Sequence, residues 1–284
     1  MKKILSTIVT VVVLIGAFLF INEDNGNNEF DVKGIINKLT TGSIENTKAD
    51  KELIGEKTNR ENYIYINNNK TSLSDNDKDL IQKNGDSEFW ADYPKLDKYG
   101  RAGKVTALVT YDSVMSHSSK AQERPSFSSS VHVAGEYKDG KFDASDQTWR
   151  GNISNNKILQ LDGYRGYIYN KSHSLAWSLG GDMETHNLTL GTRSQNVGTN
   201  KDSNGGGMGY SETQVRNAIY NNKEAKIFYE VTPVYKGKEL VPRGSHVRSY
   251  SINDDGKTIN LNVWVSNTEN GININYSNGT YSQE

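Results

Sequence analysis

The sequence predicts an α+β fold in which a central, mostly antiparallel sheet is flanked by helices and long loops. Short segments that alternate apolar and polar residues recur along the chain, which is the pattern of strands. Asn, Ser, Gly and Thr are abundant between these segments and indicate many turns. Only a few segments carry the apolar spacing or the capping residues of a helix.

The composition excludes several classes of protein. The chain of 284 residues has 33 Lys and Arg against 34 Asp and Glu, so its net charge is −1. A strongly basic nucleic-acid-binding protein is therefore excluded, and any contact with phosphate needs a local cationic patch. The chain has no Cys, which excludes disulfides, thiolate zinc sites and Cys nucleophiles.

The N-terminus has the layout of an export signal. Two lysines precede an apolar run from Ile4 to Ile21, about 18 residues long, which is near the minimum for crossing a bilayer. No A-x-A cleavage site follows the run. Residues 1–21 are therefore predicted to be an uncleaved signal-anchor, with a cleaved signal peptide as the alternative. Either one places the working domain outside the cytoplasm, in the extracellular space or at the cell surface.

Polar residues 22–59 are predicted to form a stalk or linker, and residues 60–284 to form the folded domain. The first strand is expected in YIYIN at 63–67. A helix is expected over 75–83, with Ser74 as its N-cap. Pro233 marks the strand that contains it as an edge or bulged strand. Further strands are expected in 104–111, 164–169, 227–235, 247–252 and 261–266, and a turn at Asp255-Gly256. The tail from Gly271 onwards is expected to be a small hairpin or an irregular cap.

The stretch from Tyr167 to Tyr220 concentrates the chemically useful residues. His173 ends a strand-like run, and Asn187 and Asn196 follow in an Asn-rich segment. A short amphipathic helix is predicted to open at Ser211, with Glu212 in its first turn. The Gly-rich loop at 205–209 lacks the G-K-S/T of a phosphate loop and is interpreted as a flexible connector.

These residue types suit phosphodiester hydrolysis. The reaction needs a base that works near neutral pH and a cation beside the phosphate. Imidazole has a suitable pKa, and Mg²⁺ prefers oxygen ligands such as an amide carbonyl while keeping several waters. Each residue also has a structural interpretation: His173 as an ordinary histidine, Asn196 as a turn residue, and Glu212 as a dipole partner or an i,i+4 partner of Arg216.

The order of motifs resembles a known family. N-K-S-H, then D-x-x-x-x-N-L-T-L-G-T-R-S-Q-N, then S-E-T-Q-V-R-N-A-I is similar to the DNA/RNA non-specific endonucleases of the ββα-metal type. The similarity is greatest to secreted or membrane-anchored DNases of Gram-positive cocci, including the DNA-entry nucleases. It covers most of the chain from about Tyr63. The resemblance implies a ββα-metal nuclease core within the α+β fold.

The resemblance also assigns roles. The family's D-R-G-H box reads Asn170-Lys171-Ser172-His173 here, so His173 is the implied general base. Lys171 would take the phosphate contact of the Arg, as a point charge instead of a bidentate fork. The metal-binding Asn falls on Asn196, the acidic residue of the metal motif on Glu212, and a site-supporting Asn on Asn187.

The implied reaction is metal-dependent cleavage of DNA, with RNA left open as a second substrate. His173 would deprotonate a water that attacks phosphorus in line, and Asn196 would hold Mg²⁺, or alternatively Mn²⁺; the product would carry a 5′-phosphate. Activity is expected to fall below about pH 6, where an ordinary imidazole is protonated. Binding through the backbone would have little sequence preference. The candidate cationic lining is Lys171, Arg193, Arg165 and Arg124.

Two other functions stay open. A surface DNA-binding module could keep this fold and lack activity, as the altered D-R-G-H box suggests. A surface glycosidase would need two paired carboxylates, and no pair is marked out. A monomer is expected, attached to a membrane through its N-terminal segment if that segment is uncleaved.

Overall fold

The structure, a computed structural model, describes residues 44, 46–59, 61–198 and 206–284. All of them belong to the compact unit Gly42–Glu284. The predicted signal segment 1–21 and the first half of the predicted linker lie outside the described residues. Within the described ranges, no helix combines the length and the apolar character needed to cross a bilayer.

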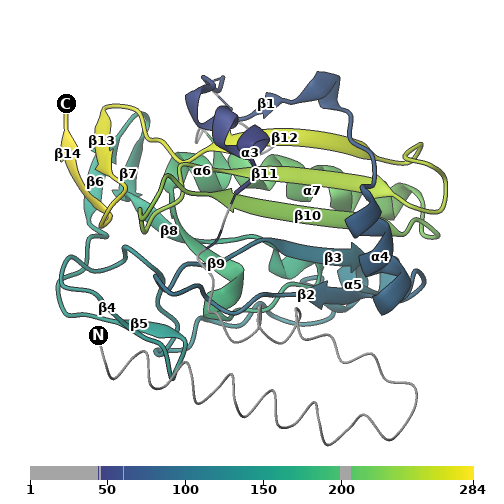
Figure 1. Ribbon diagram of the computed structural model, residues 1–284, viewed down its shortest axis with the longest axis horizontal. Helices are drawn as coiled ribbons and strands as arrows, with labels where there is room; N and C mark the ends of the chain where they lie inside the picture. The colour runs from purple at the N-terminus through teal and green to yellow at the C-terminus, as the bar shows by residue number, and fades with distance from the viewer. Residues whose placement is uncertain (1–43, 45, 60, 199–205) are drawn as a thin grey trace, which may run out of the picture. The chain divides into compact units, whose positions relative to one another are not determined.

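The centre of the fold is a six-stranded antiparallel sheet with strand order β1-β12-β11-β10-β3-β2 (Figure 1). Its longest strands are β10, β11 and β12, which follow one another in sequence and pair as a meander. The six strands are β1 (Ile64–Tyr65), β2 (Trp90–Asp92), β3 (Val105–Val109), β10 (Ile227–Val234), β11 (Gly244–Ser251) and β12 (Asn260–Ser266).

Four two-stranded units surround the sheet, and each is an antiparallel pair. They are β4 (Lys141–Asp143) with β5 (Thr148–Arg150), β6 (Ile158–Leu161) with β7 (Tyr164–Tyr167), β8 (Tyr169–His173) with β9 (Leu188–Thr192), and β13 (Ile272–Asn275) with β14 (Thr280–Gln283). The helices are α3 (Lys48–Glu52), α4 (Asp75–Asn84), α5 (Tyr111–Ser116), α6 (Arg193–Val197) and α7 (Gly207–Asn221), with short 3-10 turns at Leu53–Gly55, Asn67–Asn69, Trp177–Leu179 and Thr185–Asn187.

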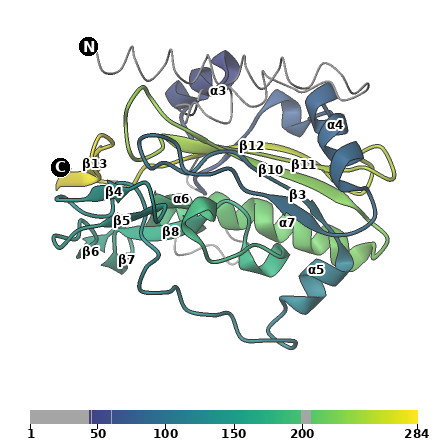
Figure 2. The ribbon, with the colours of Figure 1, turned by 60° about the horizontal axis from the view of Figure 1, so that its bottom comes forward.

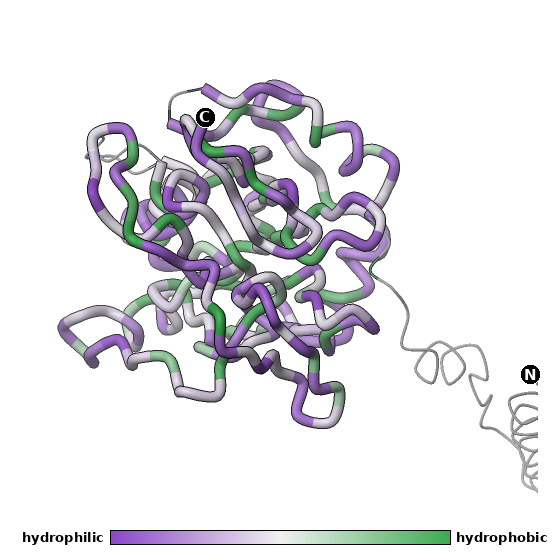
Figure 3. The backbone as a smooth tube through the Cα atoms, turned by 90° about the vertical axis from the view of Figure 1, so that its left-hand side faces the viewer, coloured by the Kyte–Doolittle hydropathy of each residue, from purple (hydrophilic) through white to green (hydrophobic). Residues whose placement is uncertain are grey.

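Helices cover both faces of the sheet. Figure 2 shows α3 and α4 on one face and α5, α7 and β8 on the other. The main core lies between α7 and the sheet, where Met208, Val215 and Ile219 pack with apolar residues of β3, β10 and β12. A second apolar cluster lies beneath β8 and β9 and includes Ile168 and Leu188. Figure 3 shows hydrophilic and hydrophobic residues interspersed along the described backbone. The central strand β10 is nevertheless buried at every position, because both faces of the sheet are covered.

Most of the predicted elements are confirmed. The predicted strands coincide with strands of the structure, and the tail after Gly271 forms the β13–β14 hairpin. The helix at Asp75 begins with a capping box, in which Ser74 Oγ accepts from the Asp77 amide at 3.2 Å and Asp77 accepts from the Ser74 amide at 2.9 Å. Asp255 and Gly256 have φ of 54° and 73°, which fits the predicted turn.

The prediction that Pro233 marks an edge or bulged strand is wrong. β10 lies between β11 and β3, and its register with β11 runs without a bulge through Pro233↔Ser245. β3 stops pairing at Val231, so the missing N–H of Pro233 removes no bond to β3. A proline is therefore tolerated near the end of a central strand where one neighbour has already ended.

The predicted start of the helix at Ser211 is also wrong, because α7 begins at Gly207 and Gly206 is its N-cap. The described glycines of the supposed connector thus open the helix. A Cβ on Gly207 would lie 2.3 Å from the Gln195 carbonyl oxygen. Gly207 also has φ of 54°, a conformation that side chains disfavour. Glycine is needed here so that α7 can begin directly against α6.

The later part of the predicted linker packs on the body of the fold. Asn46 donates to the Pro233 carbonyl at 2.8 Å and accepts from the Tyr235 amide at 2.9 Å. Asp50, on α3, lies 2.8 Å from His246 Nδ1, and His246 Nε2 lies 2.7 Å from Asn262 Oδ1. The division at residue 60 stays a prediction, but residues from Asn46 onward are anchored to the sheet.

Replacing His246 with alanine is expected to release α3. Asp50 would lose the histidine that pairs with its buried carboxylate, and a hydrogen bond to a charged group contributes about 1.5–3 kcal/mol. Local opening of α3 should increase about 10- to 100-fold. Limited trypsin digestion at Lys48 and Lys51 would measure it, and an unchanged cleavage rate would show that other contacts, such as those of Ile44 and Asn46, hold the segment.

Candidate active site

The predicted site residues lie on two paired strands followed by two helices. β8 and β9 pair antiparallel from Tyr169↔Thr192 to His173↔Leu188, and α6 follows β9 directly. A Cβ on Gly191 would lie 2.1 Å from Gln195 Oε1 and 2.8 Å from Ser172 Cβ, so glycine lets α6 fold back over the strands. Asn196 on α6 is thereby brought to β8, where Ser172 Oγ donates to its Oδ1 at 3.2 Å.

His173 ends β8 and is only 8% exposed. Its ring stacks on Phe127 at a centroid distance of 5.6 Å, and its Nε2 lies 3.3 Å from Met183 Sδ. Burial, together with the nearby Arg124 charge, lowers the pKa of His173 to about 4. The ring is therefore neutral at pH 7, and its protonation moves from the expected pH of about 6 to about pH 4.

Asn187 braces the loop that supports His173. It is fully buried, and its side chain accepts from the Leu175 amide at 2.8 Å. Its Nδ2 donates to the carbonyls of Leu175 at 2.9 Å and Asp182 at 3.0 Å. The Asp182 backbone also hydrogen-bonds His173. Asn187 therefore acts on the site through Asp182, as a positioning residue.

Replacing Asn187 with alanine is expected to lower both stability and activity. Three hydrogen bonds of a buried amide are lost, which should cost about 2–4 kcal/mol of unfolding free energy. kcat should fall as well, because the partner of His173 is released. Asn155→Ala is the matched control: it removes another buried amide, bonded to the Gly135 and Asn278 carbonyls, and should reduce stability alone. Urea denaturation and kcat, measured on both variants, separate the two effects.

Glu212 lies in the second turn of α7, one turn later than predicted. Burial raises the pKa of its carboxyl to about 7, although the charges of Arg216 and Arg124 work in the opposite direction. Arg124 therefore acts electrostatically on both His173 and Glu212. His173, the predicted base, and Glu212, the predicted acidic residue, therefore lie within electrostatic range of the same guanidinium group.

The raised pKa predicts that Glu212→Gln stabilises the protein at high pH. The folded pKa of about 7 lies above the ordinary 4.5, so the fold favours the neutral carboxyl and loses stability as pH rises through 7. The amide is permanently neutral. In EDTA the variant should therefore be more stable than the wild type by about 1–3 kcal/mol at pH 8, and nearly equal to it at pH 4.5. Denaturation at both pH values tests this; an equal difference at each pH would contradict it.

The predicted cationic lining divides into two groups. Arg124 and Lys171 gather at Phe127, with cation–ring distances of 5.7 and 5.5 Å. Lys171 is already engaged, because its ammonium donates to the Val131 carbonyl and lies 3.4 Å from Glu136.

Arg193 and Arg165 are not brought to His173 by any contact among the described residues. Arg193 opens α6 at the far end of the β8–β9 ladder and lies 4.6 Å from the Tyr164 ring. Arg165 is exposed on β7, in the neighbouring hairpin. Of the four predicted cations, only Arg124 and Lys171 therefore lie beside the imidazole.

A cationic pocket of about 340 Å³ opens beside Arg124. Arg216 lies in its wall and donates to Ser178 Oγ at 3.2 Å and to Thr213 Oγ1 at 3.1 Å. His117 and Trp177 also line it, and the buried Trp177 Nε1–H has no acceptor among the residues that the structure describes. Among the described residues that line it there is no carboxylate. This Arg124–Arg216 pocket therefore suits a phosphate group.

The side-chain amide oxygen of Asn196 is a suitable ligand for a divalent cation. Among the residues that the structure describes, no three His, Cys, Asp or Glu side chains cluster as metal ligands. The half-buried amide oxygen of Asn196 receives one hydrogen bond, from Ser172, and a carbonyl oxygen has a second lone pair. A hard cation that keeps its waters and takes few protein ligands matches such a site.

Four residues of the candidate site were not predicted from the sequence. Three of them, Phe127, Asp182 and Met183, had no assigned role, and Arg216 was considered only as a helix partner of Glu212. Phe127 lies in a polar loop with no pattern that marks it. Arg216 was visible through its i,i+4 spacing from Glu212, but that spacing also fits an ordinary surface pair.

The family model for DNA/RNA non-specific endonucleases matches residues 145–253, which include β8, β9, α6 and α7. A protein named Deoxyribonuclease from Streptococcus dysgalactiae subsp. equisimilis is 41% identical over 132 residues, or 45% of this chain. The match spans 38% of that relative's length.

Solved structures are similar to this chain over a longer part of its length. The Sda1 nuclease with bound zinc ion superposes with a TM-score of 0.64 at 29% identity, covering 79% of this chain and 98% of that one. NucA from Streptococcus agalactiae with bound magnesium ion shares the fold, with a TM-score of 0.56 at 19% identity over 80% and 89% of the two chains. The predicted α+β fold of a ββα-metal nuclease is confirmed. Residues 145–253, which carry the motifs, thus match the DNA/RNA non-specific endonuclease family, and the fold is that of the ββα-metal nuclease structures.

Proposed function

We propose that the chain is a metal-dependent endonuclease that hydrolyses phosphodiester bonds of DNA, and of RNA where it is offered, without strong sequence preference. The observation that carries the proposal is the placement of Arg124. It lines a pocket suited to phosphate and acts on both the neutral His173 and the buried Glu212. A phosphate bound at Arg124 would lie beside a base and an acid, as phosphodiester hydrolysis requires.

His173 is proposed as the general base. Its ring is neutral at pH 7, so one ring nitrogen can accept a proton from the attacking water. A pKa of about 4 makes a weak base in the free protein. Substrate phosphate would offset the Arg124 charge that lowers this pKa, and the base would strengthen as the substrate binds. The Asp182 backbone and Phe127 hold the ring in place meanwhile.

Asn196 is proposed to hold the metal, Mg²⁺ first and Mn²⁺ second. A divalent cation there would supply positive charge beside the scissile phosphate. Glu212 would accept hydrogen bonds from water in the site, and Arg124 with Arg216 would bind the phosphate oxygens. Cleavage would leave a 5′-phosphate. Contacts mainly to the sugar-phosphate backbone would give little sequence preference.

The protein is proposed to work outside the cytoplasm as a monomer. This rests on the signal-like residues 1–21, with residues 22–59 as a linker to an endonuclease domain at 60–284. An uncleaved N-terminal segment would attach the protein to the membrane.

Lys171 favours one alternative. Its pairing with Glu136 and Val131 leaves the position of the family's box Arg without a free cation. A DNA-binding module of low activity would fit that loss.

Incubation of the full chain with plasmid DNA and Mg²⁺ tests the proposal directly. Relaxed and then linear DNA should appear, and EDTA should abolish their formation. Intact plasmid together with a shifted electrophoretic mobility would favour the binding module instead.

A further inference from the structure

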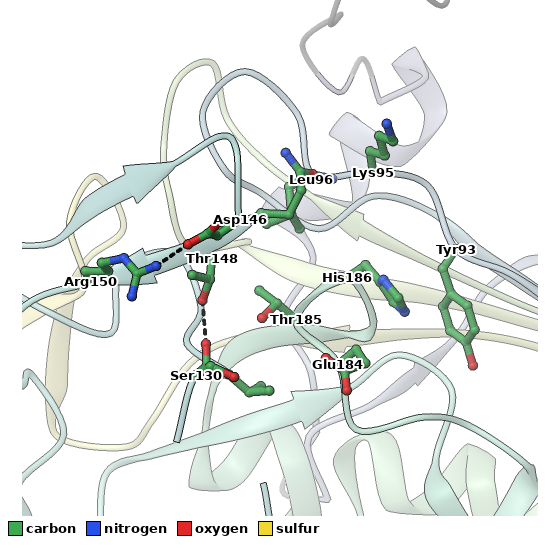
Figure 4. Close-up of a pocket in the computed structure, with 12 residues that line it drawn as sticks. Tyr93, Lys95, Leu96, Ser130, Asp146, Thr148, Arg150, Glu184, Thr185 and His186 are labelled. Carbon is green, nitrogen blue, oxygen red and sulfur yellow. Dashed lines mark hydrogen bonds and ion pairs between the residues drawn. The ribbon is translucent and has the colours of Figure 1, made fainter. Parts of the chain in front are cut away.

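A larger pocket, of about 470 Å³, lies beside the loop that carries Asp182 (Figure 4). That volume is in the range of pockets that hold small organic ligands. Tyr93 and His186 form one side of it and Arg150 with Asp146 the other, while Ser130 and Thr148 lie between them. No role in hydrolysis has been assigned to this Tyr93–His186 pocket.

The aromatic wall of the pocket is held rigidly. The rings of Tyr93 and His186 stack at a centroid distance of 4.6 Å and an interplanar angle of 26°. Asp182 fixes both, because its carboxylate lies 2.7 Å from His186 Nε2 and its amide donates to Tyr93 Oη at 3.3 Å. A pre-organised aromatic surface binds a flat ring with little loss of entropy on the protein side.

The charges of the pocket are balanced. Arg150 is paired with Asp146, as the dashed line in Figure 4 shows, and the two other charged side chains of the lining, Lys95 and Glu184, carry opposite charges that cancel in the net charge of the pocket. A phosphate would favour the Arg124–Arg216 pocket, which has no carboxylate. The Tyr93–His186 pocket instead suits an uncharged flat group. The exposed Glu184 carboxylate has no side-chain partner among the described residues and can accept from an amine on the edge of such a group.

Two sets of contacts connect the pocket to His173, the predicted base. Asp182, which fixes the aromatic wall, also hydrogen-bonds His173 through its backbone. Val131 lines the pocket, and its carbonyl accepts from Lys171, two residues before His173 on β8. A strand of nucleic acid with its scissile phosphate at His173 would therefore carry an adjacent base to this pocket.

We propose that the Tyr93–His186 pocket receives one nucleobase of the substrate strand, next to the scissile phosphate, stacked on the aromatic wall. The proposal rests on the proposed endonuclease function. A base can enter only when it is unpaired, so single strands, or duplexes with a base turned out, are the substrates that use the pocket. Base stacking on an aromatic side chain contributes about 1–3 kcal/mol, or about 5- to 150-fold in affinity.

The test uses single-stranded oligonucleotides in which one linkage is a phosphodiester and all others are uncharged methylphosphonates. The single charge fixes the register at the Arg124–Arg216 pocket. An abasic residue is then moved through the flanking positions. Kd is measured with full-length His173→Ala protein in EDTA, and kcat and KM with the wild type in Mg²⁺. His186→Ala and Glu184→Gln probe the pocket, and Tyr167→Ala, which removes an exposed ring on β7, is the control.

One flanking abasic position should raise Kd about 5- to 100-fold, and His186→Ala should remove that penalty, whereas Tyr167→Ala should keep it. Glu184→Gln should change which base is preferred and leave the stacking penalty. Equal penalties at all positions, or a penalty that survives His186→Ala, would overturn the proposal. Position-specific binding without cleavage would reject the endonuclease and keep the pocket. Cleavage without a penalty at one particular abasic position would reject the nucleobase pocket alone. Absence of any binding would reject both the pocket and the endonuclease function.

Discussion

Replacing His173 with alanine is expected to lower kcat for plasmid cleavage about 10²- to 10⁴-fold, the usual contribution of a general base. The physical reason is that the variant has no neutral nitrogen beside Arg124 to accept a proton from water. KM should change little, because the phosphate contacts are proposed to come from Arg124 and Arg216. Added imidazole should restore part of the rate by entering the space left by the ring.

His246→Ala is the matched control for this experiment. It removes a histidine that contacts Asp50 and Asn262 on the sheet, away from β8, and should leave kcat unchanged. Cleavage by His173→Ala at the wild-type rate would leave an endonuclease but exclude His173 as its base.

Replacing Asn196 with alanine should be nearly as damaging, with a loss of about 10²- to 10³-fold at low Mg²⁺. The variant lacks the amide oxygen proposed as the protein ligand of the metal, and a metal contributes several kcal/mol to stabilising charge in the transition state. The defect should be one of metal affinity. The Mg²⁺ concentration that gives half-maximal activity should rise, and imidazole should not restore the rate.

Asn196→Asp keeps an oxygen at the same position and should keep metal binding. Direct titration with Mn²⁺, followed by electron paramagnetic resonance, measures the affinity without reference to activity. Ser172→Ala removes the hydrogen bond to Asn196 Oδ1 and should weaken binding far less than loss of the ligand itself. Equal Mn²⁺ affinity in Asn196→Ala and wild type would exclude Asn196 as the ligand.

Much of the fold was predictable because local patterns determine it. The segments 227–235 and 261–266 were recognisable as strands, although β10 and β12 bury nearly every position instead of one face, and the Ser74 cap fits a helix start. His173 was predictable as a candidate because it ends a strand-like run among motifs that resemble a family.

The errors and omissions have a common physical cause, since each depends on a contact between segments distant in sequence. Gly207 opens a helix because it lies against Gln195, and Pro233 is tolerated because β3 has ended. Lys171 is occupied by Glu136, which lies in an earlier loop. Phe127 matters only because the fold brings its ring to His173.

Asp182 joins the proposed nucleobase pocket to the proposed general base. Its carboxylate meets His186, its amide meets Tyr93, and its backbone meets His173. A ligand that shifts the stacked rings of Tyr93 and His186 would therefore also shift Asp182 and change the position of the His173 imidazole. In the same way, a change at His173 would alter the positions of the two rings. The coupling free energy between binding at the rings and binding at His173 must be the same whichever site is filled first. If both proposals hold, a substrate strand long enough to fill the pocket and reach His173 would order the proposed general base, whereas a shorter fragment would leave it less ordered.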